Sequence, residues 1–251
     1  MKVLKIAFGI YAAIVFLITL LCVFPLFFLV FLLFSEKKSP VIAHNISRFW
    51  ALILFRSFFI RYTIVNSNFI SKKETYVFVA NHRSMLDIPL YARACSNTFR
   101  FLSKAELTKI PLLGYVIKNL YVTVKRGDKK DRQKSIEAMR KTLESDISIF
   151  ICPEGTRNFS DQMLLPFKDG AFRLAIATQT PLAVLTVINT DVLLSPESPI
   201  ALSPGKLIAE WSKPIDTTGM TENDVESLKQ QTATLMKEIL SRHLMTTQKQ
   251  L

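Results

Sequence analysis

The segment NHRSMLD, residues 81–87, places a histidine and an aspartate five positions apart, directly after the apolar run TYVFVA. An imidazole titrates near neutral pH and therefore suits a general base. A carboxylate that hydrogen-bonds one ring nitrogen fixes the tautomer and stabilises the imidazolium that forms. Residues five apart lie about 140° from each other on a regular helix, so His82 and Asp87 meet only if the chain turns between them. The pair predicts proton abstraction by His82, oriented by Asp87.

Taken alone, the spacing H-x-x-x-x-D arises often by chance, and a structural histidine beside a turn explains it equally well. Asp87 is expected to cap a helix that has Pro89 in its first turn, where proline is tolerated. Ser84 lies close to His82 in sequence and is interpreted as a turn or capping residue.

A second polar segment, CPEGTRNFS, also follows an apolar run. Its proline and Gly155 predict a turn, which exposes backbone N–H groups at the end of a strand. Thr156 adds a hydroxyl and Arg157 a guanidinium, and these donors suit a phosphate group. An ionised Glu154 only accepts hydrogen bonds, so we expect it to hold Arg157 or a substrate hydroxyl. The alternative is a structural turn with an exposed arginine.

The elements that must position these segments are short apolar runs alternating with segments of helical spacing, from about residue 62 onward. This alternation predicts an α/β fold with a largely parallel central sheet flanked by helices. Ligands of such sheets gather at the carboxyl ends of the strands. A final helix is expected after Thr221 and Asp224, which resemble a capping box. The predicted strands are residues 75–80, 99–103, 121–124, 147–152, 181–187 and 206–211, and the predicted helices include 131–145 and 170–179.

The N-terminal region has no charged residue from Ile6 to Phe34, a length of 29 positions where about 20 suffice to span a bilayer. Such a run is longer than the apolar core of a signal peptide, about 7–15 residues. It predicts a membrane-embedded helix. Pro25 favours a bend that lets the helix enter and leave the same leaflet, and a simple tilted span is the alternative.

A second apolar stretch, FWALILFRSFFI (residues 49–60), is too short to span a bilayer comfortably. It fits either an interfacial helix or a buried helix of the globular part. We therefore expect N-terminal membrane-associated helical segments over residues 1–61 and an α/β domain over residues 62–251.

The net charge of +12 allows nucleic acid, an anionic bilayer or a phosphorylated substrate as a partner. The stretch from Arg100 to Lys141 holds 12 Lys or Arg and 4 Asp or Glu, but no nucleic-acid-binding motif surrounds it. A basic surface that faces lipid is the favoured interpretation. The sequence has no cluster with metal-ligand spacing, so neither a metal nor another cofactor is expected.

In their order along the chain, these segments resemble the 1-acylglycerol-3-phosphate acyltransferases, a family of glycerolipid acyltransferases. NHRSMLD is similar to the family's N-H-x-x-x-x-D block, and YVTVKRG, with Arg126, to the second block, which ends in arginine. PEGTR matches the third block without a change, and TPLAVLTV, with Pro181, resembles the fourth. FLSKAELTKIPLLG, with Lys104, is similar to an intervening segment. The resemblance covers roughly residues 75–190.

Two positions depart from the family's pattern. Cys152 precedes PEGTR where many relatives carry an aromatic residue, and Val184 stands in the fourth block where many have a second proline. Neither position touches the proposed base. Both leave the preference for acyl chain and acceptor open.

The resemblance implies transfer of a fatty acyl group from acyl-CoA or acyl-carrier protein to the sn-2 hydroxyl of 1-acylglycerol 3-phosphate, which gives phosphatidic acid in phospholipid synthesis. His82 would take the hydroxyl proton while Asp87 orients the imidazole. A thioester is already activated, so the reaction requires no metal. The residues expected to bind substrate are Lys104, Arg126, Glu154, Gly155, Thr156 and Arg157.

The expected partners are a lysophospholipid acceptor, an acyl thioester and the lipid bilayer, without nucleic acid. The expected location is the cell membrane, with the catalytic domain on the cytoplasmic face. Two alternatives remain at this point: an acyltransferase for another lysophospholipid, and a catalytically silent membrane-binding scaffold.

Overall fold

A computed structural model of the chain describes residues 2–125, 127–198 and 200–248. Within them, seven strands form one sheet in the order β1-β7-β6-β2-β5-β3-β4. Adjacent strands are parallel except for β6 and β7, which pair antiparallel. The expected α/β fold with a largely parallel sheet is therefore confirmed. The strands are β1 (Ile60–Val65), β2 (Val77–Ala80), β3 (Phe99–Lys104), β4 (Val122–Val124), β5 (Ser148–Ile151), β6 (Leu182–Ile188) and β7 (Gly205–Trp211).

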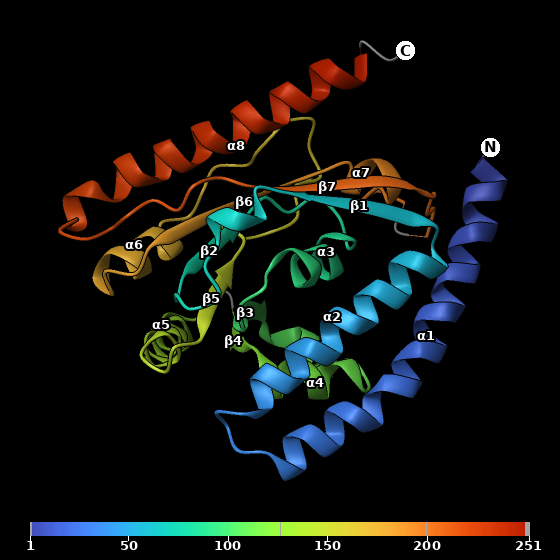
Figure 1. Cartoon of the computed structure of the whole chain (residues 1–251), viewed down its shortest axis with the longest axis horizontal. Coiled ribbons are helices and arrows are strands. Elements are labelled where there is room, and N and C mark those ends of the chain that lie inside the picture. The colour runs from blue at the N-terminus through green and yellow to red at the C-terminus, as the bar shows by residue number, and fades with distance from the viewer. Residues whose placement is uncertain (1, 126, 199, 249–251) are drawn as a thin grey trace.

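Helices cover both faces of the sheet (Figure 1). The core on one face is formed with α1, α2 and α3, and the core on the other face with α5, α6 and α8. The central strands β2, β5 and β6 have every residue buried, as expected for parallel strands covered on both sides. The helices are α1 (Lys2–Leu33), α2 (Ser39–Ser57), α3 (Asp87–Ala94), α4 (Leu113–Leu120), α5 (Lys129–Leu143), α6 (Gly170–Ala177), α7 (Thr190–Leu193) and α8 (Val225–Gln248).

The six strands expected from the sequence are all present, and one strand was not expected. Strand β1 begins at Ile60, directly after the apolar helix α2. Its first residue therefore belongs to the same apolar run as the end of that helix, and no turn signal separates the two. At the other end of the chain, Thr221 and Asp224 form the expected capping box before α8.

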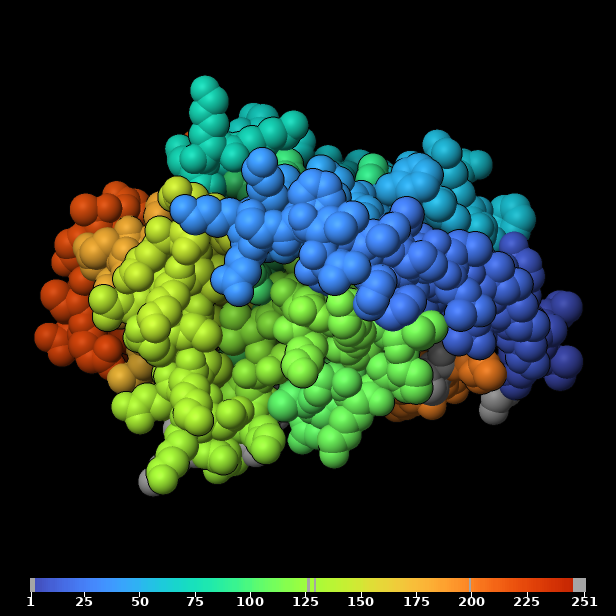
Figure 2. Space-filling view, turned by 90° about the horizontal axis from the view of Figure 1, so that it is seen from below, coloured from blue at the N-terminus to red at the C-terminus, as the bar shows by residue number. Residues whose placement is uncertain are grey.

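Helices α1 and α2 form a hairpin that packs on the α/β core, and Figure 2 shows them on one face of the molecule together with α4 and α5. Pro25 lies inside α1, which continues through it to Leu33, so the chain does not reverse its direction at the proline. The chain instead reverses in residues 34–38, between the two helices. The proline is accommodated inside a long helix, and the reversal occurs where the apolar run gives way to Ser35 and the charged residues that follow it.

Among the described residues, α1 alone is long and apolar enough to cross a membrane by length and composition. Only 22% of its most apolar window is buried in the protein, and its outward side exposes residues such as Leu17 and Leu21. Part of residues 49–60 is buried in the globular core, as one of the two alternatives predicted, and the interfacial position stays a prediction. Leu54 and Phe55 are buried in the core, whereas Phe49 is exposed.

Candidate active site

The carboxyl ends of β2, β5, β6, β3 and β4 lie at the same edge of the sheet, because these five strands are parallel. The first side chain beyond β2 is Asn81, which is completely buried. Its amide accepts the backbone N–H of Val187 at 2.8 Å and donates to the carbonyl of the same residue at 2.9 Å. The side chain thereby pairs with β6 as a further strand residue would. This contact fixes the direction in which the chain leaves β2.

His82 follows at this edge, and its Nδ1 lies 2.7 Å from Oδ2 of Asp87. The imidazole is 18% exposed, whereas the aspartate side chain is fully buried. The chain turns between them, as the sequence required, with the amide of Asp87 donating to the carbonyl of Ser84. Within the described residues, Nε2 of His82 has no hydrogen-bond partner. The geometry thus leaves one ring nitrogen held and the other open to a reactant.

Asp87 does not cap α3 as expected. The N-cap position is Leu86, and Asp87 is the first residue of the helix. Its Oδ2 turns back instead and accepts the backbone amides of Arg83 and Ser84 at 2.7 and 2.8 Å. Three donors, including His82, meet on this one oxygen and close the catalytic turn (residues 81–87).

Ser84 has the structural role expected of it. Its hydroxyl donates to the carbonyl of Leu194 and accepts the amide of Leu86, and the residue is completely buried. The hydroxyl is engaged on both sides within the turn. Ser84 therefore holds the turn against the segment that follows α7.

Glu154 joins the catalytic turn to the loop that follows β5. Its Oε1 accepts the backbone amide of His82 at 2.9 Å, and its Oε2 accepts that of Leu165 at 2.8 Å. The side chain is 3% exposed, and this burial raises the pKa of the carboxyl group, while the two amides act in the opposite direction. Each oxygen thus holds a backbone amide, and among the described residues no contact joins Glu154 to Arg157. The expected contact with a substrate hydroxyl stays a prediction.

In the PEGTR loop (residues 153–157), Pro153 is buried like Glu154, and the last three residues lie nearer to solvent. The amide of Gly155 donates to the carbonyl of Cys152, and Gly155 has φ +74°, a conformation that glycine adopts without strain. Thr156 is exposed, and the half-buried Arg157 lies over the ring of Phe159 at 5.2 Å. These two side chains remain available to a ligand at this edge.

The structure does not bring every predicted residue together. Lys104 ends β3, which pairs with β5 at the same edge, and it is exposed, 3.8 Å from Glu106. No contact joins it to the other site residues among those described. Arg126 lies outside the described residues.

Further hydrogen bonds that the sequence did not predict join His82 and Arg83 to residues 158–162 and to Asp191. Arg83 donates from Nε to Asp191 at 2.5 Å, and its two terminal nitrogens donate to the carbonyls of Gln162 and Ser160. The amide of the buried Asn158 donates to the carbonyl of His82 at 2.8 Å. Residues 158–165 thus form a strap that is tied to the catalytic turn. Only the position of Arg83 inside the polar motif pointed to such a role.

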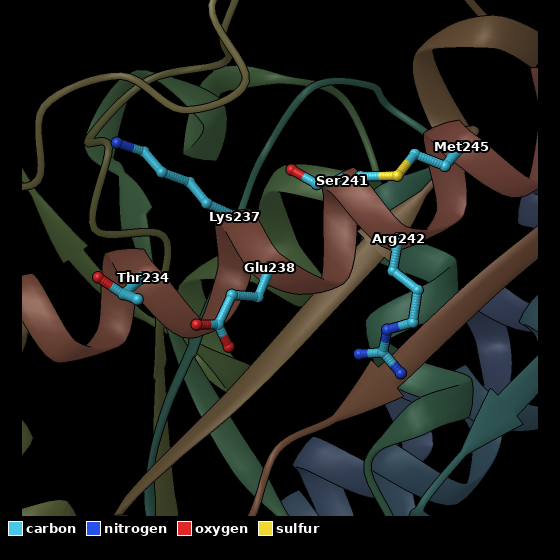
Figure 3. Close-up of a pocket in the computed structure, with 6 residues that line it drawn as sticks. All are labelled: Thr234, Lys237, Glu238, Ser241, Arg242 and Met245. Carbon is cyan, nitrogen blue, oxygen red and sulfur yellow. The ribbon is translucent and has the colours of Figure 1, made fainter.

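A groove of the molecule lies away from the catalytic pair. A groove of about 640 Å³ lies along α8, lined by side chains of that helix including Lys237, Glu238 and Arg242 (Figure 3). Neither the catalytic pair nor any PEGTR side chain lines it. In the part of the chain that the structure describes, no three His, Cys, Asp or Glu side chains are grouped to hold a metal ion.

Comparison with known proteins connects this geometry to a family. The family model described as Acyltransferase matches residues 61–188. An uncharacterized acyltransferase of Schizosaccharomyces pombe is 32% identical over 72% of this chain and 65% of its own length. The 1-acyl-sn-glycerol-3-phosphate acyltransferase of Saccharomyces cerevisiae is 32% identical over 66% of this chain and 57% of its own length. The chain therefore spans less than two thirds of the length of these relatives.

The fold is also that of a solved structure. The crystal structure of the 1-acyl-sn-glycerophosphate acyltransferase PlsC from Thermotoga maritima superposes with a TM-score of 0.80 at 22% identity, covering 96% of this chain and 97% of the other. The match includes the regions on both sides of the family model. From the family match and these relatives, the chain belongs to the acyltransferase family and is similar within it to the 1-acyl-sn-glycerol-3-phosphate acyltransferases.

Proposed function

We propose that this protein transfers a fatty acyl group from an acyl thioester to the sn-2 hydroxyl of 1-acylglycerol 3-phosphate, giving phosphatidic acid. The observation that carries the proposal is the 2.7 Å contact between Nδ1 of His82 and Oδ2 of the buried Asp87, which leaves Nε2 open at the edge of the sheet. The names of the relatives support this choice of acceptor.

The reaction begins when the acceptor hydroxyl approaches Nε2 of His82. The imidazole takes the hydroxyl proton as the oxygen attacks the thioester carbonyl, and Asp87 stabilises the imidazolium. Collapse of the tetrahedral intermediate forms the ester and breaks the carbon–sulfur bond, and the imidazolium returns its proton to the thiolate. Base catalysis of this kind contributes roughly 10²–10⁴-fold. The donor is acyl-CoA or acyl-carrier protein, either of which supplies the thioester.

The acceptor's phosphate is assigned to the side-chain donors at the end of the PEGTR loop. Thr156 and Arg157 offer a hydroxyl and a guanidinium at the end of β5, the strand beside β2. Lys104 at the end of β3 is a further cation on the same edge. Holding the phosphate there positions the hydroxyl for attack, a proximity effect worth up to ~7–11 kcal/mol in well-oriented cases.

The exposed apolar side of α1 fits the delivery of such an acceptor from a bilayer. The acceptor and the product both carry acyl chains and dissolve in the bilayer. A surface with exposed apolar residues such as Ile14, Leu17 and Leu21 therefore keeps the enzyme at the membrane that contains its substrate. We propose a location at the cell membrane, with the catalytic domain on the cytoplasmic face. The chain's net charge of +12 agrees with attraction to anionic lipid.

The experiment that tests the function is an assay of purified protein with a panel of lysolipids and two donors, acyl-CoA and acyl-carrier protein. Rapid acylation of 1-acylglycerol 3-phosphate, with slow turnover of acceptors that lack a terminal phosphate, is the expected result. Exclusive acylation of a lysolipid without that phosphate would assign the protein to another acceptor. No turnover with any combination would favour a silent membrane-binding scaffold.

A further inference from the structure

The N-terminal hairpin of α1 and α2 contacts α3 at its carboxyl end, opposite to Asp87. Arg48 of α2 donates from Nε to the carbonyl of Cys95 at 3.0 Å, and from one terminal nitrogen to the carbonyls of Ser96 and Asn97 at 2.8 and 2.5 Å. These carbonyls belong to the three residues that directly follow α3. A single guanidinium on α2 therefore holds the exit of α3.

The same contact is reinforced from the side of α3. Arg93, in its last turn, donates to the backbone carbonyl of Arg48 at 3.3 Å and to the hydroxyl of Tyr62 at 2.6 Å. The other terminal nitrogen of Arg48 donates to Asn45 on its own helix, which fixes the direction of the side chain. The two arginines thus link α2 and α3 in both directions.

A positive charge suits this position. The carboxyl end of a helix carries partial negative charge, and three carbonyl oxygens converge on the half-buried guanidinium. Burial lowers the pKa of Arg48 from its usual value, but a guanidinium remains charged at neutral pH. No carboxylate of the described residues pairs with Arg48. Its bonding capacity is directed almost entirely at the chain that leaves α3.

Helix α3 is short enough for this hold to reach the active site. It has eight residues, with Asp87 as the first and the segment held by Arg48 beginning directly after the last. A helix of this length moves as a rigid rod, so a shift or tilt at its exit changes the position of the Asp87 carboxylate. The position of this carboxylate is tightly constrained, because it accepts hydrogen bonds from His82 and from two backbone amides.

We propose that Arg48 is a positioning residue, through which the membrane-associated hairpin sets α3 and thereby holds Asp87 against His82. The hairpin then has a role in the chemical step in addition to its attachment to lipid. This inference rests on the proposed function for its kinetic consequence, but its geometric content concerns only the contact between His82 and Asp87.

The test compares Arg48→Ala with Arg56→Ala, a control on the same helix whose side chain is exposed. We expect Arg48→Ala to lower kcat about 10- to 100-fold, because a displacement of about 1 Å in a catalytic group has effects of this order. The KM for lysolipid and the fraction bound to anionic vesicles should stay unchanged, since neither surface is altered. Arg56→Ala should match the wild type in kcat and in the KM for lysolipid.

Two further readouts separate positioning from general destabilisation. Added ethylguanidinium should restore part of the kcat of Arg48→Ala, and Arg48→Lys should retain an intermediate kcat, because an ammonium keeps the charge but not the fork of donors. In protein with nitrogen-labelled histidine, the Nδ1 proton of His82, assigned by its loss in His82→Ala, should shift or broaden in Arg48→Ala. The imidazole signal should be unchanged in Arg56→Ala.

The variant is expected to fold, because other groups hold the same segment. The indole of Trp211 donates to the carbonyl of Ala94, and the side-chain amide of Asn97 donates to the carbonyls of Ser71 and Glu74. Should Arg48→Ala nevertheless fail to fold, Arg48→Lys carries the test. A lysine variant with wild-type kcat and an unchanged Nδ1 signal would overturn the inference.

The outcomes also distinguish this inference from the proposed function. A wild-type protein that acylates no lysolipid would remove the proposed function, whereas the shift of the Nδ1 signal in Arg48→Ala would still support the positioning role. An active wild type with an unchanged signal and kcat in Arg48→Ala would remove the positioning role alone.

Discussion

The catalytic turn and the PEGTR loop lie side by side at one edge of the sheet, but they are built differently. The turn is closed on itself: Asp87 accepts three hydrogen bonds, and Ser84 and Asn81 are buried and bonded on both sides. The loop is held through Glu154 and through the carbonyl of Pro153, which accepts the amide of Lys168, and it leaves the exposed Thr156 and the half-buried Arg157 open to a ligand. The difference indicates a division of labour. Groups that must keep their geometry during the reaction are tied down within the protein, and groups that must find a ligand are left open to solvent.

Removal of the imidazole should give the largest effect, because it deletes the function of the closed turn. His82→Ala is expected to lower kcat roughly 10²–10⁴-fold, the range typical of general base catalysis. Since His82 is partly exposed and, within the described residues, its side chain bonds only to Asp87, the variant should remain folded and bound to vesicles. Circular dichroism and vesicle sedimentation check both points. Turnover equal to the wild type would remove His82 from the role of base.

Truncation in the open loop should act on binding instead. Arg157→Ala is expected to raise the KM for lysophosphatidic acid about tenfold or more, because a charge-assisted hydrogen bond contributes ~1.5–3 kcal/mol. The KM for the thioester and the melting temperature should change little, since among the described residues the guanidinium lies over the ring of Phe159, itself an exposed side chain. An acceptor KM equal to that of the wild type would take Arg157 out of the phosphate site.

The sequence predicted this edge well where the signal was local. Apolar runs bounded by polar segments located the six expected strands, and the spacing of His82 and Asp87 predicted a turn that brings them together. Strand β1 was not predicted, because its first residue continues the apolar run at the end of α2 and no change in the sequence pattern marks where the strand begins.

Contacts between distant segments could not be predicted in this way. Glu154 reaches the amide of His82 across 72 positions of sequence, and Arg48 reaches the exit of α3 across 47 or more. A carboxylate in a polar loop looks the same in sequence whether it meets substrate or backbone. Only the packing of β5 beside β2, which buries the side chain, decides between them.

Glu154 tests whether the two segments act separately, because it lies in the PEGTR loop but accepts the backbone amide of His82 in the catalytic turn. Glu154→Gln places an amide NH₂ against one of the two backbone amides, which leaves a buried donor without an acceptor, at a cost of ~1–3 kcal/mol in stability. We expect kcat to fall several-fold, up to about tenfold, with the KM for lysophosphatidic acid unchanged. A raised KM with unchanged kcat would return Glu154 to substrate binding.

The difference in stability between the wild type and the same variant should depend on pH with a defined sign. Burial raises the pKa of Glu154, so the stability that this group contributes is fully present below its unfolded value and is lost as pH rises through the raised value. Glutamine does not titrate. The difference in unfolding free energy between wild type and Glu154→Gln should therefore favour the wild type more as pH is lowered from 7 toward ~4. Chemical denaturation at several pH values measures it, and the opposite trend would contradict the raised pKa.

The smallest effect is expected from a change at Thr156, the exposed side chain of the PEGTR loop. Thr156→Val removes a hydroxyl while keeping the shape of an exposed side chain, so stability should be unaffected. A neutral hydrogen bond contributes ~0.5–1.5 kcal/mol, which corresponds to an increase of roughly 2- to 10-fold in the KM for lysophosphatidic acid. Thr156→Ser keeps the hydroxyl and should stay near the wild type. Monoacylglycerol lacks the phosphate, so Thr156→Val and Thr156→Ser should have the same KM for this acceptor. A difference between their KM values would mean that Thr156 contacts another part of the acceptor.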